Sequence, residues 1–219
     1  TMDLRLYNPT VLAAAGKSIF SIGTVTIVGG NNAGEIEITG AATAKISGMT
    51  NTGTVNASGA QNVFIADTTS SGAVMVTDST AVLVGIQNNG IVTVTGGTFE
   101  MYEVINTGGN VTFSTGTVTM DDISNLGGLV TMTSGTITAT GITNTGTVII
   151  AAGAVDLTFT TNSGTLTVEE GVTGTITLTA GGASGGCSLP STVTAVGFSC
   201  GAPLPPPPSP PSPPPPPPP

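Results

Sequence analysis

The sequence predicts an all-β chain: a right-handed parallel β-helix with three faces, followed by a polyproline II tail. Three observations lead to this prediction. The motif Asn-x-Gly returns at intervals of 18 or 19 residues, apolar and polar residues alternate between its copies, and proline dominates residues 203–219. We expect about nine coils of 18–19 residues over residues 16–182. Unequal faces and a mixed interval favour the right hand, which is the usual hand of parallel crossovers.

The asparagines of the motif form the most regular column of the repeat. Equivalent asparagines on successive coils form a ladder when each side-chain amide donates to the carbonyl oxygen of the next. We therefore interpret the column as a structural device rather than a ligand-binding site. Its members are Asn32, Asn51, Asn88, Asn106, Asn125, Asn144 and Asn162, with Ser70 in the one gap.

Two pairs of apolar residues follow each motif, and in each pair the two apolar residues are separated by one other residue. A period of two indicates a strand with one buried face. In the second strand of two coils this pattern places Val82/Val84 and Ile176/Leu178 inside. Glycines such as Gly116 separate the two strands, where the chain turns a corner. A third, shorter segment adds one apolar residue, so each repeat is predicted to be a three-sided coil.

Both ends of such a stack need covering. Residues 1–15 are expected to be an N-terminal cap or the remnant of an upstream coil. Residues 183–202 are expected to be a C-terminal cap. Within it, Cys187 and Cys200 suit one disulfide in an oxidising compartment, although two free buried thiols are the alternative.

Composition removes several classes of function. The chain has no histidine, which excludes a Ser-His-Asp triad, an imidazole base and a histidine-ligated metal within it. A net charge of −9 would repel nucleic acid and anionic membrane surfaces. Polar residues interrupt every apolar stretch before the ~18 residues of a membrane span, so we expect no direct membrane insertion. No cofactor and no metal are predicted.

Residues 203–219 are predicted to form a polyproline II shaft. Their Ser-Pro blocks resemble the hydroxyproline-rich shafts of green-algal and plant extracellular glycoproteins, the extensin and pherophorin-like class. More loosely, the solenoid resembles haemagglutinin-like and adhesin β-helices. The resemblance implies hydroxylated or O-glycosylated residues, and the candidates are Pro205, Pro206, Pro207, Pro208, Ser209, Pro210, Pro211, Ser212, Pro213, Pro214, Pro215, Pro216, Pro217, Pro218 and Pro219. The alternative, an SH3 or WW ligand on a cytosolic protein, is weakened by the lack of flanking basic residues.

Two sequons point to the same extracellular setting, since Asn56 and Asn110 each begin an Asn-x-Ser/Thr triplet. The leading hypothesis is a non-catalytic structural or adhesive module of a secreted fibre, cell-wall or matrix protein. Its expected partners are other copies of the chain, other glycoproteins and glycans. It would lie in a cell wall, a matrix or a cell-surface or flagellar appendage.

Two alternatives from other classes remain. A polysaccharide-processing β-helix enzyme needs paired carboxylates across a sugar, and the candidates are Glu35/Glu37, Glu100/Glu103, Asp121/Asp122 and Glu169/Glu170. Solvated acids that keep a neutral rod soluble explain them better. An ice-binding solenoid needs threonine ladders, seen at Thr93/Thr95, Thr112/Ser114, Thr131/Thr133 and Thr165/Thr167. Met75, Ile149, Ala151 and Glu169 break those rows, and threonine is a favoured residue on any exposed strand.

Overall fold

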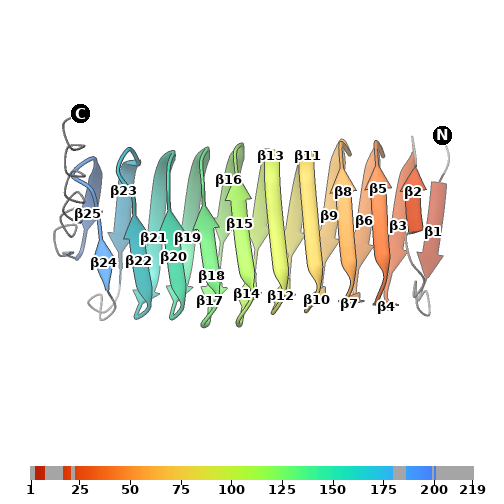
Figure 1. Ribbon diagram of the computed structural model, residues 1–219, viewed down its shortest axis with the longest axis horizontal. Helices are drawn as coiled ribbons and strands as arrows, with labels where there is room; N and C mark the ends of the chain where they lie inside the picture. Colours follow the sequence, from red (N-terminus) through yellow and green to blue (C-terminus); the bar gives the residue numbers. More distant parts are fainter. Residues whose placement is uncertain (1–2, 8–16, 21–22, 180–185, 199, 201–219) are drawn as a thin grey trace, which may run out of the picture.

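The described part of the chain is one continuous stack of parallel strands. The computed structural model describes residues 3–7, 17–20, 23–179, 186–198 and 200. These residues contain 25 strands and no helix, and all the strands belong to one sheet. The sheet winds into a β-solenoid of about nine turns, seen from the side in Figure 1. The predicted fold class is confirmed, while the tail, residues 203–219, lies outside the described residues.

The strands fall on three faces, and two long strands (β11 and β13) continue from the first face to the second. The first face holds β2 Lys17–Phe20, β5 Glu35–Thr39, β8 Thr54–Ser58, β11 Ala73–Val84, β13 Ile91–Tyr102, β15 Asn110–Ser114, β18 Leu129–Met132, β20 Thr147–Ile150, β22 Thr165–Val168 and β24 Cys187–Ser188. The second face contains the later parts of β11 and β13. Its other strands are β1 Asp3–Tyr7, β3 Thr24–Val28, β6 Thr43–Ser47, β9 Asn62–Ala66, β16 Thr117–Asp121, β19 Thr136–Asn144, β21 Ala154–Asn162, β23 Thr173–Leu178 and β25 Val193–Val196.

The third face is short and carries the asparagine column. Most of its strands have two residues, and β19 and β21 reach it with their last residues. The others are β4 Asn31–Asn32, β7 Thr50–Asn51, β10 Thr69–Ser70, β12 Gln87–Asn88, β14 Ile105–Asn106 and β17 Ser124–Asn125.

Equivalent residues stack directly over one another, because neighbouring coils pair in register. Val55, for example, pairs with Ile36 on one side and Val74 on the other. Inward residues form one hydrophobic core along the rod, in which Phe99 and Phe113 are 0% and 1% exposed. A single coil leaves its inward residues uncovered on both sides along the axis, so this burial depends on the stacking of neighbouring coils.

One coil differs from the predicted pattern on the second face. Ala81 and Leu83 point into the core, at 1% and 0% exposed, whereas Val82 and Val84 are only half-buried, so their predicted burial was wrong. Residues 81–84 are all apolar, and such a run reads equally well in either phase of a two-residue period. Pairing with the next coil decides the phase, because Ala81 lies opposite Phe99.

A second difference concerns the last full coil. Ile176 pairs with Leu157 rather than Val155, and Gly174 is the residue opposite Val155. The predicted column of Ile176/Leu178 was therefore displaced by two residues. A core position filled by glycine carries no apolar signal, so periodicity alone does not reveal it.

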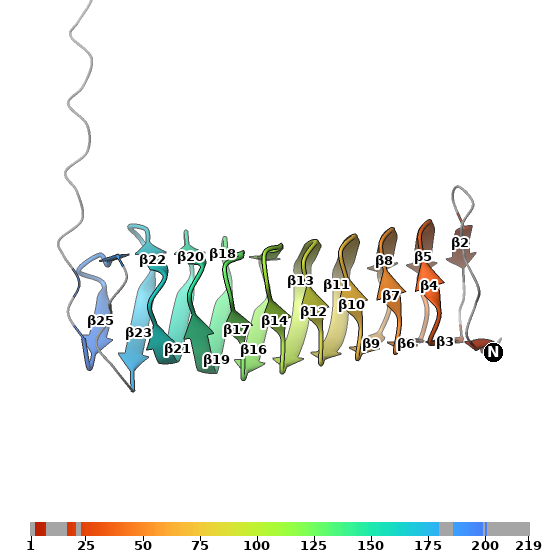
Figure 2. The ribbon, with the colours of Figure 1, turned by 90° about the horizontal axis from the view of Figure 1, so that it is seen from below.

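Both ends of the described stack continue its pairing, and they lie at opposite ends of the rod (Figure 2). At one end β1 pairs with β3, and β2 pairs with β5, so part of residues 1–15 forms a strand of the stack, which both alternatives for this segment allow. Most of that segment, including residues 8–16, lies outside the described residues. At the other end β24 pairs with β22 and β25 with β23, so the predicted C-terminal cap contains a further partial coil.

Candidate functional site

The asparagine column runs inside the corner that follows the third face. Its seven members are between 0% and 4% exposed. Along the axis, the Nδ2 of five of these asparagines donates to the Oδ1 of the asparagine one coil further on. These bonds are Asn32 to Asn51 (2.8 Å), Asn88 to Asn106 (3.0 Å), Asn106 to Asn125 (3.0 Å), Asn125 to Asn144 (2.8 Å) and Asn144 to Asn162 (2.8 Å).

The same amides also satisfy backbone groups. Asn106 Nδ2 donates to the Gly109 carbonyl at 2.9 Å, and Asn32 Nδ2 donates to the Thr54 carbonyl at 3.0 Å. In the other direction, the Gly90 amide donates to Asn88 Oδ1 at 3.1 Å. Among the described residues no buried side-chain nitrogen or oxygen lacks a hydrogen-bond partner. These amides therefore have little capacity left for a ligand.

Ser70 fills the one gap in the column, and it does so incompletely. Asn51 Nδ2 donates to Ser70 Oγ at 3.2 Å, which continues the ladder from one side. The Ser70 hydroxyl then donates to the Gly72 carbonyl at 3.4 Å, within its own turn. Because the serine side chain is shorter, the ladder of side-chain hydrogen bonds ends at the Gly72 carbonyl and does not reach Asn88.

The glycine of the motif is required by close packing between backbones. A Cβ on Gly90 would lie 2.0 Å from the carbonyl oxygen of Gly72 in the preceding coil, far inside van der Waals contact. In the coil after Asn106 the residue in this position is Gly109, whose Cβ would lie 2.2 Å from the Gly90 oxygen. In this coil the closely packed glycine is therefore Gly109, one residue after Gly108, the glycine of the Asn-x-Gly motif. The spacing of the motif did not predict this shift.

The second set of glycines turns the corner between the first two faces, as predicted. Gly40 and Gly59 have positive φ values of 65° and 60°, and Gly116 has a φ of 94°. Two residues other than glycine occupy the same corner in other coils, namely Asp78 and Thr115, with φ values of 49° and 64°. This left-handed conformation is unfavourable for residues other than glycine, asparagine and aspartate.

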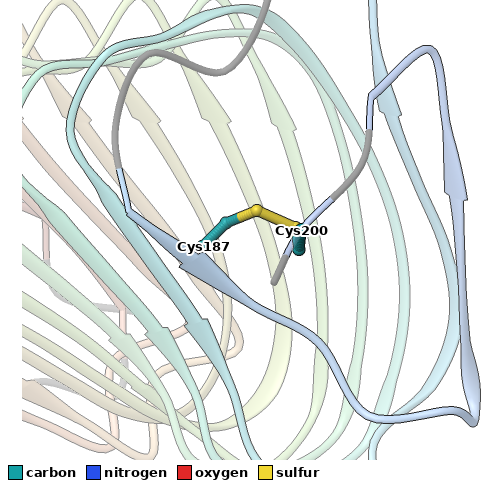
Figure 3. Close-up of a disulfide and its surroundings, with 2 residues drawn as sticks. All are labelled: Cys187 and Cys200. Carbon is teal, nitrogen blue, oxygen red and sulfur yellow. A yellow bond between two sulfur atoms is a disulfide. The ribbon is translucent and has the colours of Figure 1, made fainter. Parts of the chain in front are cut away.

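The predicted disulfide is present and closes the last coil. Cys187 and Cys200 are bonded with a Cα–Cα distance of 5.2 Å, and no free cysteine is found in the described part of the chain. Figure 3 shows the two side chains meeting, with Cys187 on its strand. Cys187 pairs with Leu166 of the preceding coil and packs against the core, as does Phe198. The bond therefore fixes the segment that covers this end of the core.

The two sequon asparagines differ in accessibility. Asn110 is exposed at the first position of β15. Asn56 is half-buried within β8, paired with Glu37 and Met75 on either side. Of the two predicted glycosylation sites, Asn110 is therefore the more accessible. All the candidate proline and serine sites of the tail lie outside the described residues.

Among the candidate carboxylates and the other described residues, no group of three or more His, Cys, Asp or Glu side chains is placed to hold a metal ion. Glu103 and Asp122 occupy equivalent exposed corners with φ values of 54° and 55°. Glu100 accepts a hydrogen bond of 3.1 Å from the Tyr102 hydroxyl. This bond, partial desolvation and the charges of Glu100 and Asp121 raise the pKa of Tyr102 above its usual value. Glu35, Glu169 and Glu170 are exposed.

The register also reveals a threonine column that the sequence pattern did not. It lies at the start of the second-face strands, beside the corner with the first face. Asn62 and Ala154 interrupt it. Its threonines are Thr24, Thr43, Thr80, Thr98, Thr117, Thr136 and Thr173.

The fold and this site define a class: a parallel β-solenoid with an internal asparagine ladder and a disulfide-closed end. No family model, curated protein or solved structure matches the chain. The described segments also include no helix long and apolar enough to cross a membrane.

Proposed function

We propose that the chain is a non-catalytic structural module of a secreted, glycosylated protein, in which a rigid solenoid carries a polyproline shaft. The observation that most supports this proposal is the asparagine ladder. Its amides are buried and donate to one another along the rod, so the most regular row of polar groups is used for cohesion. Cohesion between coils is what a structural or spacing element needs.

The mechanism of such a module is mechanical. Backbone hydrogen bonds between coils run along the rod axis, and bending the rod stretches those on its outer side. At the usual strand spacing of ~4.8 Å, nine coils give a rod about 43 Å long. Ladder bonds in the interior add resistance to the same deformation, because they link each coil to the next.

The extracellular setting rests on two further observations. A disulfide is consistent with an oxidising compartment, and the Ser-Pro blocks of residues 203–219 resemble glycosylated extracellular shafts. We propose that the shaft holds the solenoid at a distance, and that its glycans and other copies or other glycoproteins are the partners. The place of action would be a cell wall, a matrix or a surface appendage.

Fractionation of the source cells tests this proposal. With thiols blocked before lysis, the chain should be found in the extracellular fraction with Cys187 and Cys200 oxidised. A cytosolic chain with both thiols free would contradict it. In parallel, incubation with pectin-like and glucan substrates should give no product, whereas released oligosaccharides would establish the enzyme alternative.

One observation favours a second candidate, binding to ice. The second-face threonine column places exposed hydroxyl and methyl groups at the regular spacing of the coils, as on Thr117 and Thr136. Such an array can order water along the rod. Thermal hysteresis in cold solution is the readout, and its loss in Thr117→Leu together with Thr136→Leu would support this function. Absence of hysteresis in the parent chain would retire it.

A further inference from the structure

The second face carries a small hollow whose lining differs from the rest of that face. It lies over β6, β9 and β11, where Thr43, Lys45, Asn62, Val63, Phe64, Thr80 and Val82 surround it. Three of these residues share one outward column, in which Lys45 pairs with Phe64 and Phe64 with Val82. Further along the rod the same column is polar, for example at Thr119 and Thr138.

Phe64 gives the hollow an aromatic surface. Its side chain is 40% exposed, whereas Phe99, Phe113 and Phe159 are at most 1% exposed in the core. An aromatic ring left in water on a strand, where threonine is the common neighbour, forgoes the burial that the other rings obtain. Single exposed apolar residues are ordinary, but this one lines a concave surface with polar neighbours.

The polar wall of the hollow offers hydrogen-bonding groups. Thr43, Asn62 and Thr80 occupy the adjacent column, and Asn62 and Thr80 are exposed. Asn62 Nδ2 makes only a long bond of 3.5 Å to the Ala42 carbonyl. Its amide can therefore both donate and accept toward a ligand. A ring face beside hydroxyl and amide groups matches a sugar, which presents C–H groups on one side and hydroxyls at its edge.

Charge specifies the kind of sugar. Lys45 is exposed, and no ion pair engages it among the described residues. In a chain of net charge −9 this ammonium is a local exception. The acid of the same column, Glu100, lies three coils away, beyond Phe64 and Val82. A carboxylate on the ligand would thus meet an unpaired cation next to the aromatic ring.

We infer that this hollow binds a uronic acid residue of an acidic polysaccharide. The sugar ring packs on Phe64, its hydroxyls bond Asn62 and Thr80, and its carboxylate pairs with the Lys45 ammonium. The inference deepens the proposed function, since it names one glycan partner of the extracellular module. It rests on the proposed function only for the extracellular location, where the chain would encounter such a glycan.

The test is calorimetric titration of the full chain with a galacturonic acid oligomer. The methyl ester of the same oligomer is the matched ligand, since it keeps the ring and removes the charge. We expect saturable binding of the acid, weakened by added salt, and about fivefold weaker binding of the ester, as for one exposed ion pair. No binding of the acid, or equal binding of acid and ester, would overturn the inference.

Variants locate the site. Phe64→Thr is expected to weaken binding at least about tenfold through lost ring packing, whereas Phe64→Tyr should retain it. Lys45→Thr should bind acid and ester alike. Met75→Thr is the control, because it removes another exposed apolar side chain, 38% exposed, from the first face. Circular dichroism checks that each variant folds, and an equal loss in Met75→Thr and Phe64→Thr would overturn the assignment. These binding measurements do not depend on the proline shaft. A negative result would therefore overturn the sugar-binding inference alone, and the proposed function would still be decided by the fractionation experiment.

Discussion

A buried asparagine amide has two donors and one acceptor oxygen to satisfy, and burial without partners costs more than the bonds themselves contribute. In this solenoid each rung supplies partners for the next. Asn106 is 0% exposed, donates to Asn125 and the Gly109 carbonyl, and accepts from Asn88. The side chain therefore belongs to three hydrogen bonds. Its loss takes the donor from the buried Asn125 Oδ1. It also leaves Asn88 Nδ2 with only its longer bonds to the carbonyls of Gly90 and Asn110, at 3.3 and 3.4 Å.

Asn106→Ala is expected to lower the free energy of unfolding by about 2–4 kcal/mol, because it removes these three hydrogen bonds and leaves their buried partners incompletely satisfied. Urea unfolding followed by circular dichroism measures the change. Asn89→Ala is the matched control, since Asn89 is exposed in a neighbouring turn. Equal stability of the two variants would mean that the ladder contributes nothing to cohesion.

Tyr102 provides a pH-dependent prediction at the same scale. Its raised pKa means that the folded state favours the protonated phenol. The hydrogen bond to Glu100 therefore contributes to stability below the ordinary tyrosine pKa of about 10, and this contribution is lost as pH rises through the raised value. Glu100→Gln should lower the pKa of Tyr102 in a phenolate absorbance titration on a Tyr7→Phe background. Glu103→Gln should change it less, and a larger effect there would contradict the assignment.

At the scale of the strand, the sequence predicted the period of the repeat, the first-face pairs and the asparagine column. Those features depend on residue types that repeat at fixed spacing. The phase and register of the second-face strands were harder to predict from the sequence. Residues 81–84 are apolar without alternation, and Gly174 stands where an apolar residue was expected. The Lys45–Phe64 hollow also depends on register, since its residues come from different coils. Sequence spacing alone does not bring them together.

Glycine substitutions separate close packing from backbone strain. Gly90→Ala would place its Cβ 2.0 Å from the Gly72 carbonyl oxygen, so the coils must move apart. Gly59→Ala has no atom within 4 Å of the added carbon and meets only the cost of its φ of 60°. We expect Gly59→Ala to cost about 1–2 kcal/mol and Gly90→Ala clearly more. The same unfolding assay compares them, and a reversed order would show that inter-coil contact at this glycine is not tight.

At the scale of the whole molecule, the solenoid has a repeating interior and an exterior that varies from face to face. The interior is one hydrophobic core shared by the stacked coils, and the disulfide closes one end. The exterior carries the threonine column, the accessible Asn110 and the hollow at Phe64. If residues 203–219 form the proposed polyproline II spacer, extended at ~3.1 Å per residue, they would present these surfaces at a distance from their attachment.

The central claim is that this rod belongs to a secreted glycoprotein with a modified proline shaft. Intact-mass spectrometry of the C-terminal peptide, isolated from the source organism, tests it most directly. We predict a mass above that of the plain sequence, in steps of added hydroxyl groups and sugar units on residues 203–219. A peptide that carries only unmodified proline and serine would contradict the claim and favour an intracellular proline ligand.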